Sequence, residues 1–181
     1  MKSIFNPEFI IIYFITERRR AANYIIERLK YIIFEDAINE NIKNEVIKLY
    51  NSSRLTDWQS LIYVFNCKEH KERIMNIWTG LEKLEISSDR IIKLALLKTM
   101  LNTKLNQEKD MKKLLLETFE LNESGRVDDD FLHQVIYESL KIISDIEKIK
   151  NNINQLESIA IYKNNLFIKK IKNTKRRVIQ R

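Results

Sequence analysis

The chain contains very little glycine, proline or cysteine. Of its 181 residues, two are glycine (Gly80 and Gly125), one is proline (Pro7) and one is cysteine (Cys67). Glycine and proline normally make up about 7% and 5% of a protein and form most tight turns, so their scarcity argues against a many-stranded sheet and favours long helices. The single cysteine excludes an intramolecular disulfide and gives no sign of an oxidising compartment.

Long apolar runs are also absent. The most apolar stretch is residues 9–15, far shorter than the roughly 20 residues with which a helix crosses a bilayer. Three arginines at 18–20 follow this stretch, whereas a secretory signal carries its basic residues first. We therefore predict no membrane span and no export signal, and we expect an intracellular, cytoplasmic protein.

Sequence signatures of catalysis, cofactor binding and metal binding are missing. Two isolated glycines cannot form a glycine-rich phosphate loop. Cys67 and His70 have half the spacing of a zinc site, but the chain offers only His133 as a further ligand of these types, and a structural zinc needs four ligands. We predict no cofactor and no metal, and we do not expect an enzyme. Cys67 is interpreted as a small packed side chain and His70 as part of a solvated face.

Residues 120–131 resemble an EF-hand calcium loop in part. Asn122, Ser124, Gly125 and Asp128 fall at loop positions that match the motif, whereas the first position is Glu120, which departs from it. The last position, which supplies a bidentate glutamate in that motif, is Phe131 here. We therefore predict an ordinary turn between two helices, in which Gly125 adopts a positive φ and the acids at 128–130 complement the start of the next helix.

Hydrophobic residues recur at helical spacing along most of the chain. Asn6 and Pro7 mark a helix start, and an apolar stripe follows as far as Ile33. A strand over residues 9–15 is the competing interpretation of the first part. Further helices are predicted over 37–50, from Thr56 to Leu81, over 88–101, over 107–121 and from 128 onward. We predict an all-α fold, a single compact bundle of five or six helices, with Trp58 and Trp78 as core anchors of one helix pair.

The last helix carries a heptad seam. Its apolar residues step by 4, 3, 4 and 3 positions (Ile142, Ile146, Ile149, Ile153 and Leu156). The seam is too short for a long coiled coil, so we predict antiparallel pairing with another helix of the bundle. Beyond it, either the helix continues or a short β-hairpin forms near 159–171, turning at residues 163–165. We divide the chain into a helical bundle domain, 1–157, and a basic C-terminal segment, 158–181.

Positive charge is concentrated in that C-terminal segment. The whole chain has 32 basic and 25 acidic residues, a net charge of +7. Residues 158–181 contain eight basic and no acidic residues, so this segment carries +8 and the remainder carries −1. Clustered charge of one sign raises the local potential and favours contact with a polyanion.

The charge pattern leads to a functional prediction. We predict a non-catalytic helical protein that contacts nucleic acid or a ribonucleoprotein through the basic segment. The expected phosphate contacts are Lys169, Lys170, Lys172, Lys175, Arg176 and Arg177, with Phe167 as a stacking group for unpaired bases. The alternative is a protein–protein interaction adaptor that uses the 9–15 stretch or the 142–156 seam, and an exposed apolar patch would favour it.

Overall fold

The structure is a computed structural model that describes residues 6–17, 25–52, 58–82 and 89–179, with backbone alone for 17, 82 and 159–179. Every regular element among these residues is a helix and none is a strand, which confirms the predicted all-α class. Residues 25–29 are also helical. The labelled helices are α1 (Pro7–Glu17), α3 (Ala37–Asn51), α4 (Trp58–Val64), α5 (Lys68–Glu82), α6 (Asp89–Glu123) and α7 (Asp129–Ile179).

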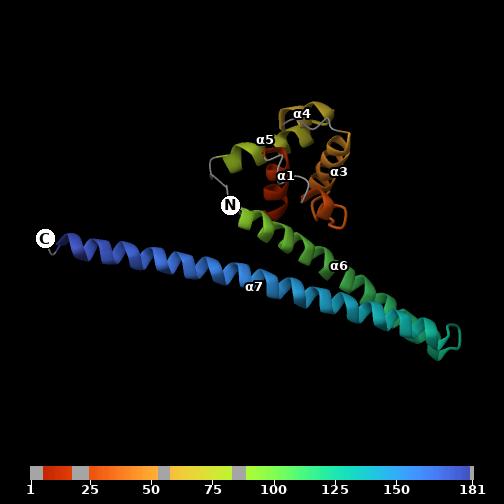
Figure 1. The fold of residues 1–181 in the computed structure, drawn as a ribbon. Helices are drawn as coiled ribbons and strands as arrows, with labels where there is room; N and C mark the ends of the chain where they lie inside the picture. The colour runs from red at the N-terminus through yellow and green to blue at the C-terminus, as the bar shows by residue number, and fades with distance from the viewer. Residues whose placement is uncertain (1–5, 18–24, 53–57, 83–88, 180–181) are drawn as a thin grey trace.

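The helices form two parts (Figure 1). α1, α3, α4 and α5 gather into a small head, which packs on the first turns of α6 through Ile92, Ala95 and Leu96. α6 and α7 form a long two-helix hairpin that projects away from the head. The described residues form seven helices, more than the five or six predicted, and these helices make a head and a projecting hairpin, whereas one compact bundle was predicted.

α1 lies at the centre of the head. Its first turn is capped as the sequence predicts, because Oδ1 of Asn6 accepts a hydrogen bond from the backbone N–H of Glu8 at 2.9 Å. Residues 10–15 are all buried, and they pack in one core with Ile42, Leu61 and Ile77. The strand alternative for 9–15 is wrong, and the head itself covers this stretch.

Three helix boundaries differ from the predictions. The helix predicted to continue as far as Ile33 ends earlier. Residues 25–29 are helical, whereas residues 32–34 have no regular structure. The helix predicted to end at Leu81 is two helices, α4 and α5, interrupted at 65–67. The helices predicted over 88–101 and 107–121 are one, because no glycine or proline lies between them to end the helical hydrogen bonding. Residues 18–20 and Thr56 lie outside the described residues.

The tryptophan prediction is confirmed. Trp58 of α4 stacks on Trp78 of α5, with ring centroids 5.2 Å apart. Tyr13 of α1 adds a third ring, 4.8 Å from Trp78. The three rings join α1, α4 and α5, and aromatic pairs in such contact contribute about 0.5–1.5 kcal/mol beyond their buried area.

The turn between α6 and α7 is built around the predicted glycine. Gly125 has a φ of 69°. The N–H of Arg126 donates to the carbonyl oxygen of Leu121 at 2.9 Å, and the N–H of Gly125 donates to that of Asn122 at 2.8 Å, which is a Schellman motif. Asp128 then caps α7, because its Oδ1 accepts from the N–H of Phe131 at 2.8 Å.

α7 runs without interruption from Asp129 to Ile179. The β-hairpin considered near 159–171 is therefore not formed, and the continued helix is. No glycine or proline follows residue 125, and residues 163–165 (Lys-Asn-Asn) lack the glycine that a two-residue hairpin turn favours. The basic segment is consequently the end of α7, continuous with the helix that precedes it.

The heptad seam packs inside the chain. Ile142, Ile146, Ile149 and Ile153 are buried, and α6 is the helix against which α7 packs. Ion pairs from Lys104 to Asp145 (3.1 Å) and from Lys98 to Glu157 (3.0 Å) show that the two helices run antiparallel. This confirms the predicted internal pairing, so α6 covers the core of the seam.

Candidate functional site

All of the predicted nucleic-acid contacts lie near the end of α7. Phe167, Lys169, Lys170, Lys172, Lys175, Arg176 and Arg177 are on helical backbone. In an α-helix, residues seven apart return to almost the same rotational position. Lys163, Lys170 and Arg177 therefore follow one line along the helix, and Lys169 and Arg176 follow the neighbouring line. The helical path thus places five of the eight basic residues on about half of the circumference.

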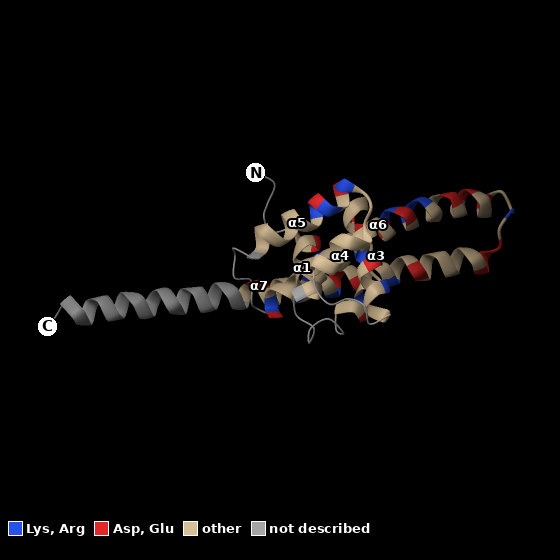
Figure 2. Cartoon of the chain, turned by 90° about the horizontal axis from the view of Figure 1, so that it is seen from above, with Lys and Arg blue, Asp and Glu red and all other residues tan. Residues whose placement is uncertain are grey.

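The other end of the hairpin has the opposite charge. The hairpin tip, residues 117–130, contains six acids and one base, Arg126, so it carries −5. Figure 2 shows the acids at the turn that joins α6 to α7. Those at 128–130 sit at the start of α7, where the helix dipole favours negative charge, as predicted. α7 therefore begins at an acidic end and finishes at a basic one.

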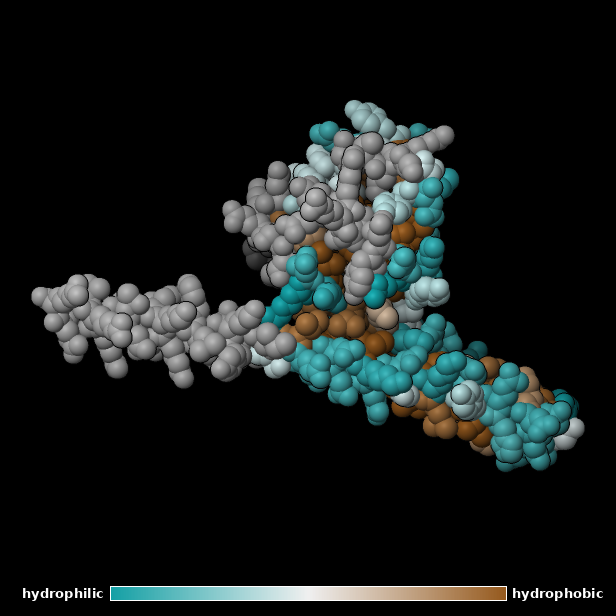
Figure 3. Space-filling model, viewed as in Figure 1, coloured by the Kyte–Doolittle hydropathy of each residue, from teal (hydrophilic) through white to brown (hydrophobic). Residues whose placement is uncertain are grey.

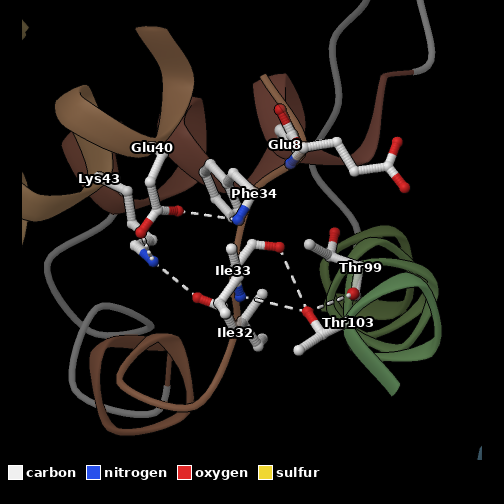
Figure 4. Close-up of polar contacts among 9 residues, drawn as sticks. Glu8, Ile32, Ile33, Phe34, Glu40, Lys43, Thr99 and Thr103 are labelled. Atoms are coloured by element: carbon white, nitrogen blue, oxygen red, sulfur yellow. Dashed lines mark hydrogen bonds and ion pairs between the residues drawn. The ribbon is translucent and has the colours of Figure 1, made fainter. Parts of the chain in front are cut away.

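A second polar cluster, which the sequence analysis missed, surrounds residues 32–36 (Figure 4). The buried ammonium of Lys43 donates to the carbonyl oxygen of Ile32 and to Oε1 of Glu40, both at 2.6 Å. Oε2 of Glu40 accepts from the N–H of Phe34 at 2.8 Å. Two side chains of α3 therefore satisfy backbone groups that no helix or sheet satisfies.

Thr103 of α6 hydrogen-bonds the same segment, residues 32–34. Its hydroxyl oxygen accepts from the N–H of Ile33 at 3.1 Å. The hydroxyl proton can be donated to the carbonyl oxygen of Ile33 (3.2 Å) or of Thr99 (3.1 Å). Because α3 and α6 both bond residues 32–34, this cluster fixes the head to the hairpin (Figure 4).

Two carboxylates complete the cluster. Oε1 of buried Glu8 accepts from the N–H of Glu35, and Oε2 accepts from the amide of Asn39, both at 2.6 Å. Burial raises the pKa of Glu8, although these hydrogen bonds favour its ionised form. Burial also acts to raise the pKa of Asp36. Hydrogen bonds from Arg73 (2.8 Å) and from the N–H groups at the start of α3, with the charge of Arg73, nevertheless lower that pKa overall.

The hydrogen bonds of this cluster are structural. Each carboxylate oxygen of Glu8 and Glu40 is hydrogen-bonded by a group of the same chain. One surface groove along α6 is lined in part by Ile33 and Thr103, but neither this groove nor the two others on α6 is lined by Glu8, Glu40 or Lys43. We therefore assign the cluster to stability. One signal was available in the sequence: Asp36 precedes the Ala37 helix start and accepts from the N–H groups of Ile38 and Asn39.

The candidate metal and nucleophile positions differ from the interpretation above. Cys67 is exposed, so the prediction that it packs as an apolar group is wrong. The ring of His70 is partly buried and stacks on Phe65, with centroids 4.9 Å apart, so it does not lie on a fully solvated face. In the part of the chain that the structure describes, no three His, Cys, Asp or Glu residues lie close enough together to hold a metal ion.

Comparisons with protein families, curated proteins and solved structures find no match to this chain. Among the described helices, none combines the length and the apolar character needed to cross a membrane. The features of this chain that bear on function are therefore the two charged ends of the hairpin and the surface between them.

Proposed function

We propose that the protein binds nucleic acid or a ribonucleoprotein through the basic end of α7. The observation that carries this proposal is that α7 is 51 residues long and its antiparallel partner α6 is 35. At 1.5 Å per residue, α7 extends about 24 Å beyond α6. This extension, residues 164–179, contains six basic residues and no acidic residue.

A helix that carries cations over half of its circumference can follow a phosphate backbone. Neutralising phosphates releases condensed counterions, so the binding is independent of sequence and depends steeply on salt. Contacts from all six of Lys169, Lys170, Lys172, Lys175, Arg176 and Arg177 set an upper limit: a slope of log K against log salt of about −5 for duplex DNA and about −4 for a single strand. Phe167 is one turn from Ile171 and would stack on bases if the strand is unpaired.

The test is fluorescence anisotropy of the full chain with duplex and single-stranded oligonucleotides of DNA and RNA over a range of salt. The test variant carries Lys169→Gln, Lys170→Gln and Lys172→Gln. We expect weaker binding at low salt and a slope less steep by about 3 on duplex DNA. A preference for single strands that Phe167→Ala removes would identify the stacking contribution.

The matched control carries Lys109→Gln, Lys112→Gln and Lys113→Gln. These residues are exposed on α6, so the variant loses the same charge from another part of the hairpin. Equal effects of the two variants would show a response to net charge alone. That result, or the absence of binding at low salt, contradicts the proposal.

The alternative function, a protein–protein interaction adaptor, would use residues 9–15 or the 142–156 seam. Other parts of the chain cover the core of both surfaces. Residues 10–15 are buried in the head, and the isoleucines of the seam are buried against α6. Most of the exposed large hydrophobic side chains, eight of the thirteen in the described residues, lie on the outer half of the hairpin. A protein partner would therefore use that surface.

A further inference from the structure

The outer half of the hairpin exposes an unusual amount of apolar surface. Thirteen large hydrophobic residues are exposed in the described parts of the chain, and eight of them lie between residues 114 and 143. Figure 3 shows hydrophobic side chains at the surface along this part of the hairpin. The eight are Leu114, Leu116, Phe119, Leu121, Phe131, Tyr137, Leu140 and Ile143. Clustered exposed apolar residues mark interaction surfaces.

The core of this region is thin. Beyond Leu96, no hydrophobic residue of α6 is buried, and the opposing residues of α7 are covered on the side of the seam only. Two antiparallel helices have a single contact seam, whereas a helix bundle surrounds its apolar residues with additional helices. Additional helices from outside the described chain would supply the missing cover.

The C-terminal part of α7 has a complementary composition. By sequence, residues 155–168 are rich in large apolar residues: Leu156, Ile159, Ile161, Leu166, Phe167 and Ile168. The basic residues 169–177 follow directly. On the hairpin, the exposed apolar residues at 131–143 come directly after the acidic tip, so the order of apolar and charged residues is reversed. One chain therefore contains two apolar segments of α7, one beside acidic residues and one beside basic residues, which could pair with each other in a helical contact.

We infer that a second copy of this chain covers the outer half of the hairpin, with the two α7 helices antiparallel. A two-fold axis near about residue 149 sets residues 131–143 of one copy beside residues 155–167 of the other. The same register sets the acidic tip beside residues 168–172 of the other copy, which include Lys169, Lys170 and Lys172. Two-fold symmetry forms this contact twice, so both apolar surfaces and both charged ends are matched.

The association state tests this inference. Sedimentation velocity is measured on the full chain after nuclease treatment, so that nucleic acid cannot bridge two copies. We expect a dimer that dissociates as salt rises. Leu116→Lys with Leu140→Lys, at positions 66% and 60% exposed, should raise the dimer Kd at least about tenfold. Helical content should stay unchanged, because neither side chain belongs to the core.

The control variant carries the same substitution on the head. Tyr63→Lys with Met75→Lys replaces residues that are 84% and 49% exposed on α4 and α5. This variant should dimerise like the parent chain. Equal weakening by the two pairs of substitutions would overturn the inference.

Charge reversal tests the register. Glu120→Lys with Asp130→Lys reverses two tip charges and should weaken the dimer. Adding Lys169→Glu and Lys172→Glu to the same chain should restore it. A chain that is monomeric at all concentrations, or a reversal that the second pair does not restore, overturns the inference. Because no nucleic acid is present, this outcome is independent of the nucleic-acid proposal.

Discussion

The substitution Lys43→Met tests whether the cluster at residues 32–36 stabilises the protein. The ammonium of Lys43 is buried, and it bonds the carbonyl oxygen of Ile32 and Oε1 of Glu40 at 2.6 Å. It also lies 5.3 Å from the ring centroid of Phe34. Methionine fills a similar volume without a charge or a donor, so it removes these interactions with little change in packing.

The expected loss follows from the groups left behind. The carbonyl oxygen of Ile32 loses its charged donor, and an unsatisfied buried acceptor costs about 1–3 kcal/mol. Glu40 keeps the N–H of Phe34 and is 25% exposed, so the loss of its ion pair adds about 1 kcal/mol. Replacing both partners of a buried pair can be neutral, but this substitution removes only one. We expect the free energy of unfolding to fall by about 2–4 kcal/mol.

Urea denaturation followed by circular dichroism measures this free energy. Lys48→Met is the matched control, because Lys48 is on the same helix, also pairs with an acid three residues away, and is 76% exposed. It should cost less than about 0.5 kcal/mol. A loss for Lys43→Met no larger than that of the control would refute the assignment of this cluster to stability.

Two further predictions concern the turn and the carboxylates. Gly125→Ala should lower thermal stability by about 1 kcal/mol because φ is 69°, whereas Gly80→Ala, inside α5 with open space around it, should stabilise by up to about 1 kcal/mol. Equal effects would contradict the turn geometry. The lowered pKa of Asp36 contributes stability at pH values above the ordinary aspartate pKa of 3.8, and this stability is lost as pH falls through the folded-state pKa. The raised pKa of Glu8 acts in the opposite sense, with its contribution largest below 4.5 and lost as pH rises through the folded-state pKa. Urea titrations at several pH values measure the free energy of unfolding of the parent chain, Asp36→Asn and Glu8→Gln. The stability of the parent relative to Asp36→Asn should fall as pH falls, and its stability relative to Glu8→Gln should fall as pH rises. Parallel pH profiles would contradict both shifts.

The sequence predicted the local features of the fold better than its long-range contacts. Asn6, Gly125 and the seam of α7 depend on residues a few positions away, and the structure confirms each. The path of residues 32–36 depends on Lys43 and on Thr103, which is 70 residues from Ile33. A buried lysine is rare, and the groups of residues 32–34 that Lys43 and Thr103 bond are backbone groups, which leave no pattern in the sequence. The helical prediction to Ile33 failed for this reason.

At the candidate site, too, the sequence predicted the local features and missed those that depend on long-range contacts. Net charge can be counted along the sequence, so the basic segment and its residues were predictable. The split of the helices into a head and a projecting hairpin was not, because it depends on which apolar residues of α6 face α1 and which face α7. The exposed surface between 114 and 143 was missed for that reason. The same Ile and Leu composition would suit a buried helix.

The length of α7 connects the two proposals. The extension of α7 beyond α6 continues a packed helix and needs no new nucleus, but without packing partners its propagation gains little per residue. A partner that covers the extension would therefore stabilise it. The acidic tip of a second copy and a phosphate backbone both offer negative charge to the same cations, so they compete for the extension. A polyanion that binds there should consequently release the second copy, and the apolar surface of the hairpin would then be exposed only in the nucleic-acid-bound protein.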